Sequence, residues 1–204
     1  MGLKRAKLEQ ILEGLEKIAN PRAELEQYQT PARLASEILF DAYFRGDVEE
    51  KRVADLGCGN GVFLLGAKLL GAAEATGVEA DPSSLDVARR NAQALGLDVE
   101  WKEADVEDAE GVFDTVFQNP PFGSQNRHAD LPFLRMAMGV GRVVYSLHNE
   151  KAVKFLQGKI RAFGGHLDYT KKYKFPLPYQ YPFHTKEIAY YDVVLFRIVM
   201  PIDR

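Results

Sequence analysis

The strongest constraint on the fold is an alternation of short apolar segments with helical segments that begins near residue 52. The apolar segments predict five strands, at 52–56, 75–79, 99–102, 112–118 and 142–146. The segments between them predict helices at 61–70, 83–94 and 151–163. Residues 105–111 are too few to hold a full crossover helix between the third and fourth strands. Strands that alternate with helices in this way form a parallel sheet covered on both faces.

The two ends of the chain have different patterns. A first helix is predicted at 3–19, and a second at 31–44, where Thr30 is expected as the N-cap and Pro31 as the first helical residue. Residues 167–175 and 187–199 are rich in aromatic and β-branched residues, as expected of a terminal antiparallel pair. The fold class predicted is therefore α/β, with a seven-stranded, mostly parallel sheet, helices on both faces and a C-terminal antiparallel hairpin.

Composition excludes several classes of protein. The 204 residues have a net charge of −3, one cysteine and four scattered histidines, which gives no disulfide and no zinc signature, so no metal is expected. No segment is apolar enough to span a membrane, and a cytoplasmic location is expected. The net charge argues against a positive field over the whole surface. A local basic cluster remains open as an RNA contact or as a solvated strand end: Lys171, Lys172 and Lys174, interleaved with Tyr169, Tyr173 and Phe175.

A glycine-rich loop follows the first predicted strand. Residues 55–61 read Asp-Leu-Gly-Cys-Gly-Asn-Gly and stand at the carboxyl end of that strand, where doubly wound sheets bind ligands. Three glycines in five residues permit a tight turn and let a ligand approach the backbone closely. The alternative is that the loop is only a tight connection between strand and helix.

Two acidic residues at the end of the second strand favour the ligand-binding interpretation. Glu79 and Asp81 follow the glycines by about 20 residues, a position from which a carboxylate can accept both hydroxyl protons of a ribose. The loop lacks the lysine and hydroxyl residue of a phosphate-binding P-loop, and it is not a clean GxGxxG fingerprint. The pattern favours a nucleoside with a compact, cationic tail.

These two motifs resemble motifs I and II of the class I S-adenosylmethionine-dependent methyltransferases, which have a Rossmann-like fold. The resemblance rests on DLGCGNG at 55–61 and GVEAD at 77–81, and it implies S-adenosyl-L-methionine as the cofactor. It assigns six residues to that cofactor: Gly57, Asn60, Val62, Glu79, Asp105 and Val106. Asp55 is either a surface strand terminus or a carboxylate near the positive sulfonium.

A stiff turn follows the fourth strand at the same edge of the sheet. It consists of Asn119, Pro120, Pro121 and Phe122, and consecutive prolines leave its carbonyl groups facing outward. An exocyclic NH2 that donates to the Asn119 side-chain oxygen and the Pro120 carbonyl would move toward tetrahedral geometry and free its lone pair for methylation. Phe122 offers a flat face to a base. The alternatives are a structural turn and an ordinary core aromatic ring.

The NPPF sequence resembles the signature of methyltransferases that act on adenine N6, guanine N2 or a glutamine amide, and the residues alone leave the acceptor open. Residues 25–31, 119–124 with Asn126, 144–148, 174–175 and 181–184 together resemble the archaeal and eukaryotic small-subunit ribosomal RNA adenine-N6 methyltransferases. The resemblance implies adenine N6 as acceptor and cofactor contacts by Gln27 and Thr30. Tyr28 either packs inside or caps the site. This chain departs from the common LEQYPT in placing its proline after the threonine.

The same resemblance implies a domain organisation and a partner. Residues 1–204 form one methyltransferase domain, in which the helices within 1–45 cover the cofactor site and 46–204 make the core. Eukaryotic members pair with a small zinc-containing activator subunit, and the third strand, with Trp101, is predicted at a sheet edge open to such pairing. Alternatively, Trp101 is buried against a helix. A non-catalytic scaffold is the last alternative, although every position that the chemistry needs is filled.

Overall fold

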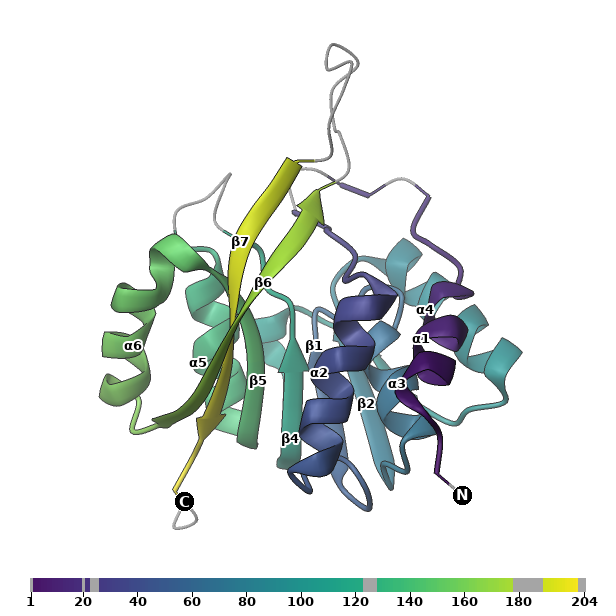
Figure 1. Ribbon diagram of the computed structural model, residues 1–204, viewed down its shortest axis with the longest axis horizontal. Coiled ribbons are helices and arrows are strands. Elements are labelled where there is room, and N and C mark those ends of the chain that lie inside the picture. The colour runs from purple at the N-terminus through teal and green to yellow at the C-terminus, as the bar shows by residue number, and fades with distance from the viewer. Residues whose placement is uncertain (1, 20, 23–25, 123–127, 178–188, 202–204) are drawn as a thin grey trace.

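A seven-stranded sheet forms the centre of the molecule in the computed structural model (Figure 1). The structure describes residues 2–19, 21–22, 26–122, 128–177 and 189–201. The strands run in the order β3-β2-β1-β4-β5-β7-β6. Their bounds are β1 Arg52–Leu56, β2 Glu74–Glu79, β3 Glu100–Glu103, β4 Phe113–Gln118, β5 Gly141–Asn149, β6 His166–Leu177 and β7 Ala189–Val199.

The pairing of the strands confirms the predicted fold class. Strands β1 to β5 pair in parallel, whereas β7 pairs antiparallel with both β5 and β6. The C-terminal hairpin therefore adds to the sheet with β7 inside and β6 at the edge. Strand β3 forms the opposite edge, as predicted. Strands β1 and β4 pair with each other near the centre of the sheet, and β5 pairs with the other side of β4.

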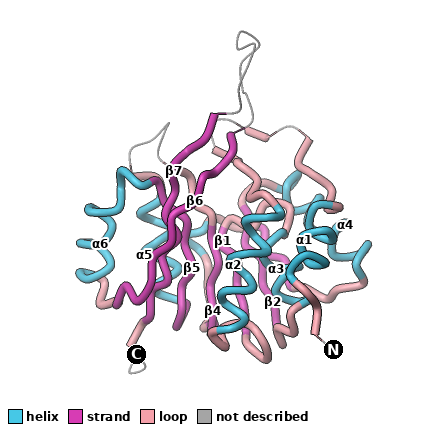
Figure 2. Tube along the Cα trace, in the orientation of Figure 1, coloured by secondary structure: helices cyan, strands magenta, loops and turns pink. Residues whose placement is uncertain are grey.

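Helices cover both faces of the sheet (Figure 2). Their bounds are α1 Arg5–Glu13, α2 Ala32–Phe44, α3 Val62–Leu69, α4 Pro82–Leu95, α5 Asp130–Val140 and α6 Val153–Ala162, with 3-10 turns η2 Val106–Asp108 and η3 Glu150–Ala152. The sequence analysis did not predict α5. Pro132 lies in its first turn, where a helix tolerates proline because the N–H groups there need no helical partner.

The predicted start of the second helix and end of the first are wrong. Helix α2 begins at Ala32 with Pro31 as its N-cap, and Thr30 does not cap it. The Thr30 hydroxyl instead accepts a hydrogen bond from the Asn119 side chain at 3.1 Å. Helix α1 ends at Glu13 rather than at residue 19, where the Gly14 N–H donates to the Ile11 carbonyl and the Leu15 N–H donates to the Leu12 carbonyl.

Apolar side chains fill a layer on each face of the sheet, as the alternation of strand residues requires. On one face Val53, Phe117 and Tyr145 pack with residues of α1, α2 and α3. On the other, Ala54, Val116 and their neighbours pack with residues of α5 and α6. The buried layers fix the positions of the strand ends, and the loops that leave those ends form the site described below.

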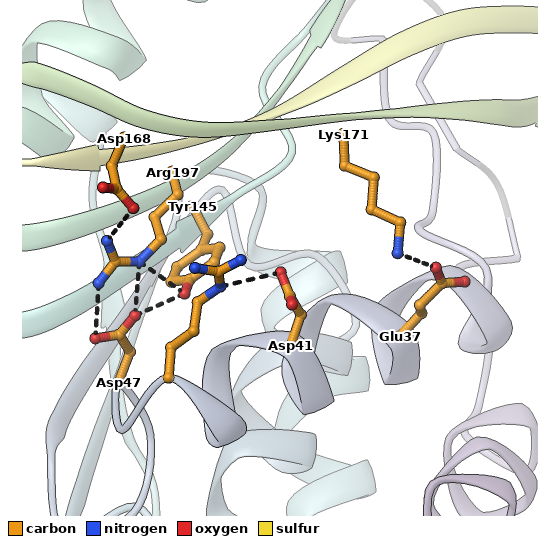
Figure 3. A network of polar contacts seen from close by, with 8 residues as sticks. Glu37, Asp41, Asp47, Tyr145, Asp168, Lys171 and Arg197 are labelled. Atoms are coloured by element: carbon orange, nitrogen blue, oxygen red, sulfur yellow. Dashed lines mark hydrogen bonds and ion pairs between the residues drawn. The ribbon is translucent and has the colours of Figure 1, made fainter.

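A buried ionic network fastens the C-terminal hairpin to the rest of the sheet (Figure 3). The Asp47 carboxylate accepts from the Tyr145 hydroxyl at 2.6 Å and from two nitrogens of Arg197 at 2.9 and 3.2 Å. Arg197 also donates to Asp168 at 2.7 Å. Burial and the bond to Asp47 raise the pKa of Tyr145. The network joins the segment after α2 to β5, β6 and β7.

Two features are absent from the described part of the chain. No helix there is long and apolar enough to cross a membrane. No group of three or more His, Cys, Asp or Glu side chains in that part is placed to hold a metal ion.

Candidate active site

A cavity of about 320 Å³ opens at the carboxyl ends of β1, β2 and β4. Eleven of the residues that the sequence analysis selected line it: Gln27, Thr30, Asp55, Gly57, Asn60, Val62, Glu79, Asp105, Val106, Asn119 and Pro121. Pro120 and Phe122 do not line it. The structure thus brings the glycine loop and the Asn119 turn to one cavity.

The glycine loop takes a backbone path that only glycine adopts without strain. Gly57, Gly59 and Gly61 all have positive φ, at 73°, 52° and 85°. A Cβ atom on Gly57 would approach the Phe133 ring to 3.0 Å. The Gly57 N–H donates to the Val78 carbonyl at 2.8 Å, which holds the loop against β2. The backbone of the loop therefore forms one wall of the cavity.

Glu79 connects this loop to the end of β2. One carboxylate oxygen accepts the Gly59 N–H at 2.9 Å, and the other accepts the Asp81 N–H at 3.0 Å. Burial raises the pKa of Glu79, and these backbone bonds oppose the rise. A carboxylate has about four lone-pair sites, so each oxygen retains acceptor capacity toward the cavity. That geometry suits a pair of vicinal hydroxyl groups.

Asp81 and Gln27 form a second polar group beside Glu79. Asp81 caps α4 by accepting the Ser84 N–H at 3.0 Å and also accepts the hydroxyls of Ser83 and Ser84. Burial acts against these bonds, but together with a bond from Gln27 they lower the pKa of Asp81 to about 2. The Gln27 amide donates to Asp81 at 3.3 Å, which ties residues 26–30 to the cavity rim.

Asp55 is not a surface strand terminus, because its side chain is buried at 2% exposure. Its Oδ1 has no hydrogen-bond partner among the described residues. Burial, reinforced by the charge of Glu79, raises the pKa of Asp55 well above its usual range. A buried carboxylate without a partner is costly unless a cation compensates it. The cavity wall at Asp55 therefore suits a positively charged group.

The Asn119 side chain is oriented by two neighbours from the N-terminal segment. Its NH2 group donates to the Tyr28 carbonyl at 3.0 Å and to the Thr30 hydroxyl at 3.1 Å. Both amide protons are thereby used, which fixes the direction of the amide group. The Asn119 Oδ1 atom is buried and has no partner among the described residues. The side chain leaves an open acceptor at the wall of the cavity.

Phe122 packs as a core aromatic ring in this structure, with 7% of its surface exposed. The Tyr28 ring stacks against it at 6.2 Å between centroids and 17° between planes. Phe175 and Tyr191, from the hairpin, contact it edge to face at 5.3 and 6.1 Å. Tyr28 therefore lies over the acceptor turn, on the side where the sequence analysis expected a base to stack.

A buried polar chain on the other face of the sheet was not predicted as a unit. The Gln118 amide donates to Ser146 at 2.8 Å, Ser146 contacts the His148 Nε2 atom at 2.7 Å, and His148 Nδ1 contacts Asp130 at 2.9 Å. All four side chains are buried. Gln118 precedes the acceptor turn, and Asp130 begins α5 after it. The chain joins the two ends of the 119–129 segment, of which 123–127, with Asn126, lie outside the described residues, as do 181–184.

Several cavity residues escaped the sequence analysis. Phe133 and Ala129 belong to or precede the unpredicted α5, and Gln29 precedes Thr30, which was selected. The sequence gives little indication that these residues line a site, because residues of these types are common in ordinary helices and loops. Phe133 lies at the cavity because α5 packs against the glycine loop, where its ring would lie 3.0 Å from a Cβ atom on Gly57.

The fold and this cavity define a Rossmann-like methyltransferase that takes a cofactor of the S-adenosylmethionine type. The chain belongs to the methyltransferase small domain family, whose model matches residues 34–138. The same fold occurs in magnesium protoporphyrin IX methyltransferase of Synechocystis, solved with bound S-adenosylmethionine, at a TM-score of 0.67 and 14% identity over 93% of this chain and 88% of that one.

Relatives of similar length match nearly the whole chain. The rRNA N(6)-adenosine-methyltransferase Mettl5 of Drosophila melanogaster is 34% identical over 96% of both chains. An uncharacterised protein of Methanocaldococcus jannaschii is 36% identical over 96% of this chain and 94% of its own. A crystal structure of a candidate RNA methyltransferase from Pyrococcus horikoshii has a TM-score of 0.91 and 38% identity, covering 99% of this chain and all of that one.

Proposed function

We propose that this protein transfers the methyl group of S-adenosyl-L-methionine to the exocyclic N6 amine of an adenine in RNA, and that the RNA is ribosomal RNA of the small subunit. Its similarity to the Drosophila rRNA N(6)-adenosine-methyltransferase supports the adenine acceptor. S-adenosyl-L-methionine supplies a methyl group made electrophilic by a sulfonium. The residues that line the cavity fit this cofactor and explain how each part of it is held.

Three groups of the cavity would hold the cofactor. The buried carboxylate of Asp55, whose Oδ1 atom has no hydrogen-bond partner among the described residues, compensates the positive end of the molecule. The free lone pairs of Glu79 accept the ribose hydroxyl protons. Asp105 and Val106 border the adenine, while the Gly57 backbone, Asn60 and Val62 border the methionine part. Gln27 and Thr30 close the cavity from the N-terminal side.

The observation that carries the proposal is the orientation of the Asn119 amide. Its NH2 group is committed to Tyr28 and Thr30, so Oδ1 is the atom available to an acceptor amine. This oxygen accepts one N–H of the adenine amine, and the Pro120 carbonyl accepts the other. Two such bonds favour a tetrahedral nitrogen whose lone pair is no longer delocalised into the ring. Pro120 and Pro121 keep the turn stiff.

Access of the base depends on Phe122 and Tyr28. The two rings are nearly parallel at 6.2 Å, and a base stacked on both would require roughly 7 Å, twice an aromatic contact distance of about 3.5 Å. A displacement of Tyr28 therefore admits the base onto the Phe122 face. The proton that leaves the methylated amine passes to water. His148 is buried in its own chain with Ser146 and Asp130 and serves as no base here.

The proposed acceptor is tested by identifying the methylated nucleoside. The protein is incubated with radiolabelled S-adenosylmethionine and unmodified small ribosomal subunits, and the RNA is then digested to nucleosides. We expect the label in N6-methyladenosine and none with Asn119→Ala. Label in N2-methylguanosine, or in protein as a methylated glutamine, would refute the adenine acceptor. Cofactor binding with no transfer to any acceptor would support a non-catalytic scaffold.

We also propose that residues 1–204 act as one methyltransferase domain, with the helices within 1–45 covering the cofactor site and 46–204 forming the core, in the cytoplasm. A small zinc-containing activator subunit would pair with β3, which has β2 as its neighbour on one side. Trp101 leaves this edge accessible, since its ring packs inward over Gly77, where a Cβ would lie 2.7 Å from it. Co-purification of such a subunit, lost on mutation of β3, tests the pairing.

A further inference from the structure

The ionisable residues divide unevenly between the two halves of the chain, before and after the start of β4. The 112 residues before β4 contain 13 basic and 22 acidic residues, whereas those from β4 onward contain 13 basic and 7 acidic ones. The net charge of −3 thus combines −9 on one half with +6 on the other. Because β1 and β4 are neighbours, the boundary between the halves runs past the cavity. The half that carries the acceptor turn is positive.

Helix α6 and the 3-10 turn η3 before it carry positive charge that no described neighbour neutralises. Lys151, Lys154 and Arg161 are exposed, and none forms an ion pair with a residue that the structure describes. The cluster on β6 that the sequence suggested is different, because its three lysines pair with acidic residues: Lys171 with Glu37, Lys172 with Glu150 and Lys174 with Asp192. Phe175, the third aromatic residue of that cluster, is fully buried. Of these two neighbouring clusters, the one on η3 and α6 therefore keeps its positive charge uncompensated, and the one on β6 does not.

The same helix adjoins the end of the acceptor segment. The His128 ring stacks on the Phe155 ring of α6 at 4.1 Å between centroids and 27° between planes. Phe155 is 37% exposed, and the Lys159 ammonium lies 5.4 Å from its centroid. Ala129, the next residue after His128, lines the cavity. A single stacked pair thus connects the rim of the cavity to the positive helix.

We infer that the outer face of α6, with the His128–Phe155 pair at its inner edge, is the surface that binds the RNA backbone next to the target adenine. This inference rests on the proposed function and adds the location of the RNA. Lys154 and Arg161 are seven residues apart and share one face of the helix, about 10 Å apart along its axis. The face lies at the end of the molecule opposite α1 and α4 (Figure 1).

The division of charge also orients the RNA. A polyanion is attracted to the half that contains α6 and repelled by the half that contains the cofactor residues. A backbone bound along α6 leaves its flanking nucleotide near His128, from which the base reaches the Asn119 turn. The acidic overall composition is therefore compatible with RNA binding, because most of the acidic excess is in the chain before β4.

The test compares two double variants that each remove two lysines. Lys151→Ala/Lys154→Ala, called the α6 variant, acts on η3 and the first turn of α6, and Lys7→Ala/Lys17→Ala removes the same charge from the acidic half. Binding of a fluorescently labelled single-stranded RNA is measured by anisotropy at several salt concentrations. Each phosphate contact contributes about 0.7 to the slope of log K against log salt for single strands. We expect the slope of the α6 variant to decrease in magnitude by about 1.4, with affinity about 25-fold lower at 0.1 M salt.

The control variant is expected to bind RNA within about twofold of the unmodified protein, and both variants should bind cofactor normally in calorimetry. An α6 variant with unchanged RNA affinity, or a control that loses as much, would overturn the inference. Failure of the proposed function has a different result: the unmodified protein would bind RNA through α6 but would not methylate adenine. If the α6 variant still labels adenine and its salt slope is unchanged, the inferred RNA-binding surface is refuted and the proposed function is not.

Discussion

Replacing Glu79 with alanine should weaken cofactor binding strongly. Each Glu79 oxygen accepts one backbone N–H, at 2.9 and 3.0 Å, and retains lone pairs for one ribose hydroxyl. A hydrogen bond to a charged group contributes about 1.5–3 kcal/mol. Loss of two such bonds costs at least about 3 kcal/mol, which corresponds to a Kd raised at least about 100-fold.

Isothermal titration calorimetry with S-adenosylmethionine measures this effect directly. The matched control is Glu103→Ala, because Glu103 is the exposed register partner of Glu79 on β3 and does not line the cavity. Its Kd should match that of the unmodified protein. If Glu79→Ala bound the cofactor within about threefold of normal, the ribose assignment and the reasoning from its free lone pairs would both be wrong.

Three further predictions concern the groups that hold the site in place. Asp47→Asn removes the carboxylate that neutralises the largely buried Arg197 guanidinium, and urea denaturation should show a loss of about 3 kcal/mol in the free energy of unfolding with cofactor affinity unchanged. Ser146→Ala leaves buried partners of the polar chain unpaired and should cost about 1–3 kcal/mol by the same assay, whereas no loss would mean that the chain is unimportant for stability. Because the folded-state pKa of Asp55 is raised, the contribution of Asp55 to the stability of the cofactor-free protein should be fully present below its unfolded pKa and lost as pH rises through its folded pKa. Asp55→Asn should show a smaller fall, and an identical pH profile in the two proteins would contradict the burial argument.

Much of the fold could be predicted because strand and helix periodicities differ so clearly after residue 52. The β1 bounds were predicted to the residue, and the antiparallel hairpin followed from its aromatic and β-branched content. Helix α5 was missed because Pro132 and the polar segment before it give no helical start signal. The early end of α1 was missed because Leu15 and Ile18 continue the apolar pattern after the helix stops.

The site could be predicted where chemistry fixes the type of residue, and not where packing fixes its place. The glycine loop, Glu79 and Asn119 meet at one cavity because the strands that precede them are parallel and adjacent or nearly so. The role of Thr30 as a partner of Asn119 depends on a contact between residues 89 apart, which no local pattern reveals. The net charge of −3 likewise concealed a division of charge between the residues before β4 and those from β4 onward.

The central claim is that the Asn119 oxygen acts on the acceptor amine and not on the cofactor. Calorimetry and single-turnover methylation of the same Asn119→Ala protein test it most directly. The account predicts cofactor affinity within about threefold of normal together with transfer slowed at least about 100-fold, the range found when one positioned hydrogen-bonding group is removed from an active site. A collapse of cofactor affinity, or methylation at the normal rate, would contradict it.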